Sequence, residues 1–489
     1  MLQPGPSGGA AALLTLTGDL PDSGRSAATR RDYGDAKPVP AGSIDDAHQP
    51  PHNHCRQRRW RRCGQFNAPA RRGRAASCID AGDAGLRPDS AQDQTQVLQR
   101  AIDRAAQARL PLMLPPGTYR AAGLRLPANA KIAGTRGLSR LVLARAASLF
   151  TANGAANVDL TGLVIDGDRL NLPPDRALVH VADGHDIRIT DCSIVNAGRS
   201  AIALERCSGI VSGCIIEDAG DAALFAIDSL GLRIAGNVIR RSGNNGIQVW
   251  RSASGNDGTI VTDNRIEDTR ADAGGDGPYG NAINIFRAGN VIVRGNRIDK
   301  CAFSAVRGNS ASNIQIAGNV CTRMGEVAIY SEFSFEGAVI TGNTVDGATV
   351  GISVTNFSDG GRLAVVQGNL IRNLTPDRNG HSMGIGIEAD GVVTGNVIEN
   401  AATCGIAVGY GPYLRDVIVS DNVLRAVAAG VAVSVAPGAG TVLIANNLIT
   451  ETKHGAVVGM EWDKRVTGDL TKEGVGKHAH VTLSGNRVR

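Results

Sequence analysis

Short runs of alternating apolar and polar residues recur from about residue 157 to the end of the chain. Three of them read LRIAGNVI at 232–239, VIVRGNRI at 291–298 and VVTGNVI at 392–398. The alternation predicts short strands that bury one face, and the Gly-Asn pair predicts a tight turn. Copies recur roughly every 22–27 residues, a period typical of a solenoid. We therefore predict about a dozen coils, whose stacked strands are parallel because every coil advances in one direction.

An asparagine follows the turn glycine in most copies. Asn tolerates left-handed backbone and bonds turn backbone, and strands stack about 4.8 Å apart, so an internal ladder of these side chains is expected. Cys192 and Cys214 hold the same position in earlier coils, where we expect buried thiols, with a disulfide after export as the alternative. The asparagines are Asn237, Asn264, Asn296, Asn319, Asn343, Asn369, Asn396, Asn422, Asn447 and Asn486.

The segment before the repeats carries a helical pattern at 92–108, followed by short apolar strands and the sequence LPPGTY at 114–119. A helix here would cover the apolar end and the unpaired strand edges of the first coil. We expect an all-β, right-handed parallel β-helix, with an N-terminal cap of helix and first coils at 79–156 and the repeat domain at 157–489. The apolar stripe of the helix consists of Val97, Leu98, Ala101, Ile102 and Ala105.

Residues 1–78 lack any such pattern, and we expect a disordered or wrongly assigned segment. The first 75 residues carry a charge of +6, whereas the other 39 Lys/Arg and 40 Asp/Glu nearly cancel. The net charge of +5 therefore comes from this segment. Because the repeats are nearly neutral, no nucleic-acid partner is predicted for them. An export signal is the alternative, because Thr29-Arg30-Arg31 resembles a twin-arginine start. Polar residues nevertheless follow where an apolar stretch belongs.

Composition excludes further classes of protein. The nine cysteines form no CxxC pair, so no zinc site is predicted, and no apolar run reaches the about 18 residues of a membrane span. No cofactor is predicted with certainty. Ca²⁺ is a candidate ligand of Asp272 and Asp276, because carboxylate oxygens bind this ion, and an ordinary Gly-Asp-Gly turn is the alternative. The oligomeric state stays open.

The opening segment and the coils resemble the pectin-lyase-like superfamily of right-handed β-helix proteins. Within it, the chain most resembles the uncharacterised twin-arginine-translocated repeat proteins of alphaproteobacteria. The resemblance covers about residues 80–489 and rests on Asp93-Gln94-Thr95, the Leu98-Gln99-x-Ala101-Ile102 helix, LPPGTY and the GNxI coils. It implies export to the periplasm or medium. Many relatives in the superfamily act on polysaccharides, but a shared fold does not determine function.

The second strand of each coil can be aligned on its G-I-x-V core, which predicts two rows of outward side chains. Both rows hold large polar and aromatic residues between about 248 and 388, and small residues from 407 onward. Aromatic rings can stack on sugars, and amides can bond their hydroxyls. The predicted substrate-binding residues are Gln248, Trp250, Asn284, Phe286, Asn309, Glu388 and His381.

Three outward residues in adjacent coils are the predicted catalytic groups. Elimination on a uronate polymer needs a group that neutralises the carboxylate, a base for the C5 proton and an acid for the leaving oxygen. Arg307 could serve as the first or second, Tyr330 as the second or third, and Glu332 lies beside them. Glu332 and Glu388 could instead form a hydrolase pair, but two coils separate them by about 10 Å, near the outer limit for such a pair. His381 is a candidate acid or base, with an idle surface histidine as the alternative.

Two functions follow from the sequence. The first is an exported lyase or C5-epimerase of acidic polysaccharide, for which the mixed patch and the resemblance argue. The alternative is a non-catalytic carbohydrate-binding or cell-surface structural repeat protein, for which the regularity of the coils argues. Convergence of Arg307, Tyr330 and Glu332 in an open groove would favour the enzyme, and burial of them under a loop would favour the binding protein.

Overall fold

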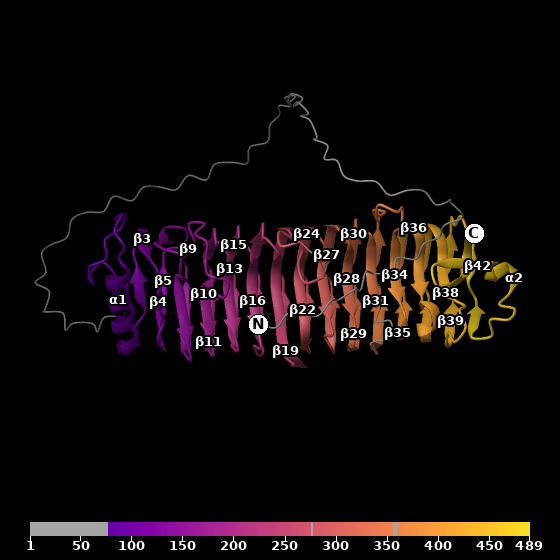
Figure 1. The fold of residues 1–489 in the computed structure, drawn as a ribbon, viewed down its shortest axis with the longest axis horizontal. Helices are drawn as coiled ribbons and strands as arrows, with labels where there is room; N and C mark the ends of the chain where they lie inside the picture. The colour runs from indigo at the N-terminus through magenta and orange to yellow at the C-terminus, as the bar shows by residue number, and fades with distance from the viewer. Residues whose placement is uncertain (1–76, 275–276, 356–359) are drawn as a thin grey trace, which may run out of the picture. The chain divides into compact units, whose positions relative to one another are not determined.

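The computed structural model describes residues 77–274, 277–355 and 360–489. From Ser77 onward these residues form a right-handed parallel β-solenoid of about 14 turns, preceded by one short helix. The predicted fold class is confirmed, with slightly more coils than the dozen expected. In Figure 1 the strand labels follow chain order along the stack, from α1 to α2.

Each complete coil contributes a strand to three ladders, which we call faces A, B and C. Face A comprises β1 (Ile79–Asp80), β2 (Leu112–Leu114), β5 (Lys131–Gly134), β8 (Ala156–Thr161), β11 (His185–Thr190), β14 (Gly209–Ser212), β17 (Arg233–Ala235), β20 (Ile260–Thr262), β23 (Ile292–Arg294), β26 (Ile314–Ala317), β29 (Glu336–Thr341), β32 (Arg362–Gln367), β35 (Ala389–Thr394), β37 (Arg415–Ser420), β39 (Val442–Ala445) and β43 (Val481–Ser484).

Face B carries the predicted site. Its strands are β4 (Leu124–Arg125), β7 (Phe150–Asn153), β10 (Ala177–Ala182), β13 (Ser200–Glu205), β16 (Ala222–Ile227), β19 (Asn245–Asn256), β22 (Asn281–Gly289), β25 (Val306–Asn309), β28 (Val327–Glu332), β31 (Val350–Thr355), β34 (Met383–Ile387), the second halves of β36 (Val397–Val408) and β38 (Val423–Ser434), and β41 (Gly455–Glu461). A last strand, β42 (Lys464–Asp469), pairs with β41 antiparallel.

Face C begins on the cap and shares two long strands with face B. Its strands are β3 (Gly117–Ala121), β6 (Ser139–Leu143), β9 (Val164–Asp166), β12 (Ser193–Val195), β15 (Ile215–Glu217), β18 (Val238–Arg240), β21 (Arg265–Thr269), β24 (Arg297–Cys301), β27 (Val320–Met324), β30 (Thr344–Asp346), β33 (Leu370–Arg372), the first halves of β36 and β38, β40 (Leu448–Thr450) and β44 (Arg487–Val488).

The opening helix lies where the pattern predicts it. Helix α1 spans Thr95–Ala108, and the stripe that includes Leu98, Ala101 and Ile102 is buried. Two short helical segments occur later, Gly411–Tyr413 and α2 (Leu470–Glu473). None of the helices in the described ranges is long and apolar enough to cross a membrane.

The predicted asparagine ladder is present. Asn296 Nδ2 donates to Asn319 Oδ1 at 2.9 Å, and Asn319 Nδ2 donates to Asn343 Oδ1 at 3.0 Å. The same contact links successive asparagines from Asn237 to Asn486. Cys214 closes the other end, where its backbone N–H donates to Asn237 Oδ1 at 3.0 Å. The cysteines of the described residues are free, and Cys192 and Cys214 are buried, as expected.

Candidate functional site on face B

The two predicted outward rows exist with the register expected from the sequence. Gln248 pairs with Asn284, Asn284 with Arg307, and Arg307 with Tyr330. The second row likewise runs from Trp250 through Phe286 and Asn309 to Glu332. Period-2 alternation and in-register stacking therefore place these side chains in adjacent coils on one surface.

Arg307, Tyr330 and Glu332 converge. Arg307 Nε donates to Glu332 Oε1 at 2.6 Å, and the Arg307 guanidinium lies 5.1 Å from the centre of the Tyr330 ring. Asn309 Nδ2 donates to the same carboxylate oxygen at 2.9 Å. The exposed fraction is 12% for the Arg307 side chain and 2% for that of Glu332. The three groups form a buried, internally neutralised cluster.

The loop between β21 and β22 contacts this cluster. A Cβ added at Gly277 would lie 3.2 Å from both terminal nitrogens of Arg307. The backbone carbonyl of Pro278 accepts hydrogen bonds from Asn245 Nδ2 at 2.9 Å and from Asn284 Nδ2 at 3.1 Å. The amide of Asn284 thus holds the loop, and Gln248 beside it is buried.

Burial also changes the acid–base character of Tyr330. Its hydroxyl is desolvated and lies near the negative charge of Glu332, and both effects raise its pKa well above the usual value. The phenol is therefore neutral at physiological pH. The raised pKa keeps the proton on Tyr330, so this phenol is unsuited to act as a base and is a weaker acid than an exposed tyrosine.

The remaining predicted polar residues lie in the coil of β34. His381 is buried, its backbone N–H donates to Asp377 Oδ1 at 2.8 Å, and its Nδ1 lies 3.8 Å from the same oxygen. Glu388 is buried directly after β34. The ladder of β28, β31 and β34 places it two coils beyond Glu332. Glu332 and Glu388 therefore do not lie in adjacent coils.

Of the two candidate Ca²⁺ ligands, Asp272 already has an ion-pair partner and Asp276 lies outside the residues that the structure describes. Asp272 pairs with Arg270, whose Nη2 lies 2.8 Å from the carboxylate. Asp276 lies outside the described residues. Within the described ranges, no group of three or more His, Cys, Asp or Glu side chains could hold a metal, so Ca²⁺ remains a sequence prediction.

Aromatic side chains form a continuous line on the accessible part of face B. The ring centres of Phe225 and Trp250 are 5.6 Å apart, as are those of Trp250 and Phe286, and all three side chains are half-buried. We call these three residues the aromatic strip. Two arginines follow its members directly. The guanidinium of Arg287 lies 4.7 Å from the Phe286 ring centre. Nε and Nη1 of Arg251 are buried and have no hydrogen-bond partner within the described part of the chain.

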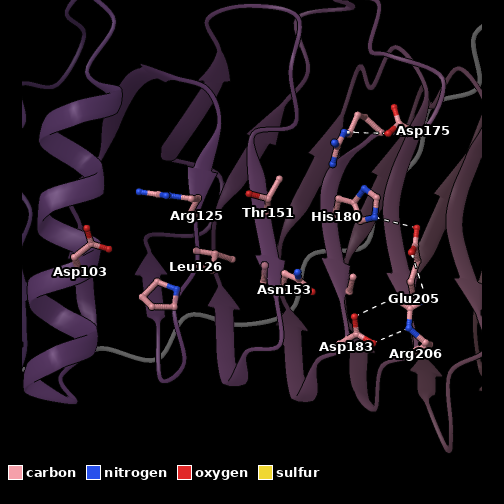
Figure 2. A pocket seen from close by; sticks show the side chains of 14 residues that line it. Asp103, Arg125, Leu126, Thr151, Asn153, Asp175, His180, Asp183, Glu205 and Arg206 are labelled. Carbon is pink, nitrogen blue, oxygen red and sulfur yellow. Dashed lines mark hydrogen bonds and ion pairs between the residues drawn. The ribbon is translucent and has the colours of Figure 1, made fainter.

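A cleft that the sequence pattern does not predict lies on the same face, nearer the N-terminus. Its volume is about 770 Å³, and it is formed by helix α1, strands β4, β7, β10 and β13, and the segment that precedes β10. Figure 2 shows Asp103 on α1 at one side and Glu205 and Arg206 at the other. The rows of face B do extend back to it, since His180 pairs with Ala203 and Ala203 with Phe225. Alignment of the coils from 157 could have found His180, but the contribution of the helix could not be seen.

Comparisons with known proteins agree with the fold. A family model described as a right-handed β-helix region matches residues 147–259 and 211–371. No curated protein matches the sequence. Solved structures that are similar include the catalytic unit of a thermostable α-1,3-glucanase from Streptomyces thermodiastaticus, with 16% identity over 86% of this chain and 70% of that one, at a TM-score of 0.45.

Two other similar structures are not described as enzymes. The surface adhesin PfbA of Streptococcus pneumoniae shares 14% identity over 80% of this chain and 94% of that one, at a TM-score of 0.42. The pre-mature gene product 12 of bacteriophage phi29 shares 12% identity over 84% of this chain and 72% of that one, at a TM-score of 0.46.

Proposed function

We propose that the protein binds an extended acidic polysaccharide along face B. The observation that carries this proposal is the aromatic strip with Arg251 and Arg287 directly beside it. Half-buried rings in successive coils offer stacking surfaces spaced about 4.8 Å apart along the solenoid axis. A polymer that lies along this axis would contact several coils at once.

The two arginines favour an anionic polymer. Among the described residues, neither Arg251 nor Arg287 forms an ion pair with a carboxylate, whereas arginines of neighbouring coils do, as Arg241 does with Asp218 at 2.8 Å. Arg287 makes one neutral contact, in which Nη1 donates to the carbonyl of Ser252 at 3.0 Å. The Arg251 guanidinium lies close enough to the buried Asp257 to oppose the rise in the pKa of that carboxyl that burial causes. Nε and Nη1 of Arg251 nevertheless have no hydrogen-bond acceptor among the described residues, and a uronate carboxylate would supply one through charge-assisted hydrogen bonds.

The test measures binding of the full chain to alginate, polygalacturonate and hyaluronan, with neutral dextran for comparison. Titration calorimetry or affinity electrophoresis would follow the wild type, Trp250→Ala and, as a matched control, Trp462→Ala, which removes an exposed tryptophan outside the strip. We expect binding to at least one acidic polymer, weakened about tenfold by Trp250→Ala and unchanged by the control. Equal binding of dextran, or no effect of Trp250→Ala, would contradict the proposal.

A second candidate is elimination or C5 epimerisation at Arg307, Tyr330 and Glu332, and their convergence is what favours it. In elimination a base removes the C5 proton, a C4–C5 double bond forms, the C4–O bond breaks, and the leaving oxygen takes a proton. Tyr330 would donate that last proton. Against this role, the charge of Arg307 is already neutralised by Glu332, and Gly277 lies over the guanidinium.

The catalytic candidate has its own assay. The same polymers are incubated with the protein, with and without Ca²⁺, while ultraviolet absorbance reports unsaturated uronates and NMR reports epimerised residues. Product formation that is abolished by Tyr330→Phe, with polymer binding retained, would establish the enzyme. Binding without product under every condition would leave the non-catalytic function.

A polysaccharide partner agrees with an exported protein, and we propose a periplasmic or secreted location. The motif that supports it, Thr29-Arg30-Arg31, lies outside the described residues. Cell fractionation of the wild type and of an Arg30→Lys, Arg31→Lys variant tests the proposal. Retention of both proteins in the cytoplasm would contradict it.

A further inference from the structure

The N-terminal cleft lies where face B ends. Strand β4 is the first strand of this face, and helix α1 packs beside it, with Leu98 and Ile102 buried. The cleft spans the four strands β4, β7, β10 and β13, which at about 4.8 Å per step is about 14 Å. Its volume of about 770 Å³ falls within the range of small-molecule sites, about 300–1,000 Å³. A polymer lying along the strip toward the N-terminus would therefore meet helix α1 as an end wall.

The end wall is tied to strand β4 by the side chain of Gln99, in addition to its buried apolar stripe. Gln99 on α1 donates from Nε2 to the carbonyl of Arg125 at 2.9 Å and to Asp103 Oδ1 at 2.9 Å, while its Oε1 accepts from the Arg125 backbone N–H at 2.8 Å. The helix is thereby fixed to β4. The guanidinium of Arg125 lines the cleft, is exposed, and forms no ion pair within the described ranges.

The opposite wall is a polar network across adjacent coils. His180 Nε2 lies 3.1 Å from Glu205 Oε1, and Arg206 forms a two-point contact with Asp183, at 2.6 and 3.0 Å. Asp183 is already paired through both oxygens. Glu205 also lies near Arg206, with Oε2 3.8 Å from Nη1, but its side chain is 32% exposed and its oxygens can accept further hydrogen bonds. Exposed Asn153 lies on the cleft surface between the two walls.

We propose that this cleft binds the terminal sugars of an acidic polysaccharide chain. Arg125 pairs with a carboxylate of the terminal unit, and Asn153 and Glu205 bond hydroxyls of that unit and of the units that follow it across the cleft. The proposal rests on the function proposed for the strip and deepens it, since Glu205 lies only two strand steps, about 10 Å, from Trp250 in the same row. A chain on the strip therefore reaches the cleft without leaving face B.

The experiment uses short oligosaccharides, which can occupy the cleft without covering the strip. Saturated tetrasaccharides of alginate and of polygalacturonate, each in native and borohydride-reduced form, are titrated into the full chain by calorimetry. The variants are Arg125→Ala, Trp250→Ala and, as a matched control, Arg233→Ala, which removes an exposed arginine of face A that forms no ion pair with any described residue.

We expect Arg125→Ala to weaken binding of one tetrasaccharide about tenfold, because a charge-assisted contact is lost. Arg233→Ala and Trp250→Ala should leave this binding unchanged. Borohydride changes only the reducing end, so a changed affinity would identify that end as the one in the cleft, and an unchanged affinity would assign the cleft to the non-reducing end. Binding that is insensitive to Arg125→Ala would overturn the inference. Loss of polymer binding on Trp250→Ala with unchanged tetrasaccharide binding separates the strip from the cleft. Failure of the strip proposal alone would appear as polymer binding that depends on Arg125 and not on Trp250.

Discussion

Arg307 and Glu332 face each other across adjacent coils of face B, with Nε and Oε1 2.6 Å apart and with side chains 12% and 2% exposed. Removal of one partner leaves the other charge buried without compensation. We expect Glu332→Ala to lower the free energy of unfolding by about 3 kcal/mol, measured by urea denaturation. Arg323→Ala breaks an exposed pair with Asp299 and should cost less than about 1 kcal/mol. Equal losses in the free energy of unfolding for the two variants would show that burial adds nothing to the cost of breaking the Arg307–Glu332 pair.

The asparagine ladder should be most sensitive in its middle. Asn319 Oδ1 accepts from both the backbone N–H and Nδ2 of Asn296, at 3.0 and 2.9 Å. Asn319→Ala leaves that buried backbone N–H unsatisfied, whereas Asn296 Nδ2 keeps two carbonyl acceptors. An unsatisfied buried donor costs about 1–3 kcal/mol, so we expect a destabilisation of up to about 3 kcal/mol in thermal or urea unfolding. Asn486 lies at the half-buried end of the ladder, where water can replace the lost contacts, so Asn486→Ala should cost clearly less. A larger effect at the end than in the middle would contradict this account.

Stability should fall in acid because of ion pairs between coils. Hydrogen bonds from Arg241, Arg323 and Arg415 lower the pKa of Asp218, Asp299 and Asp390, respectively. A carboxyl whose pKa is lower in the folded state contributes stability above its unfolded pKa, about 3.9, and loses it as pH falls through the folded value. We expect a melting temperature that is nearly constant from about pH 7 to 5 and drops below about pH 4.

A substitution identifies the source of that drop. Asp218→Asn should flatten the acid limb of the curve, whereas Asp421→Asn should leave it unchanged, since Asp421 is exposed and forms no ion pair among the described residues. The same acid limb in both variants would assign the drop to other carboxyls.

Binding of an acidic polymer should depend on salt. Exposed charges are screened over a Debye length of about 10 Å at 0.1 M salt, so affinity should fall as sodium chloride rises. Arg251→Gln with Arg287→Gln should weaken binding and reduce its salt dependence, and Arg233→Gln on face A serves as the control. An unchanged salt dependence in the double variant would remove these arginines from the binding surface.

The sequence was sufficient for the register of the coils. Alternation with period 2 and the recurring Gly-Asn turn are local properties, so the pairing of Trp250 with Phe286 and of Arg307 with Tyr330 follows from the aligned repeats. The capping helix could also be predicted from the sequence, because its buried apolar stripe follows the helical period. These features need no knowledge of distant contacts.

The tertiary structure alone decided which outward residues are accessible. Arg307 and Glu332 point away from the solenoid core, yet their mutual pairing and the loop at Gly277 bury them, and the path of an irregular loop is not encoded in a repeat pattern. The cleft likewise requires helix α1 to lie beside strand β4, through contacts of Gln99 with a residue 26 positions later. What the sequence by itself determined was therefore the direction of each side chain, because direction follows from local periodicity. Exposure and the shape of the cleft depend on packing between segments that are distant in the chain, and only the folded structure specifies that packing.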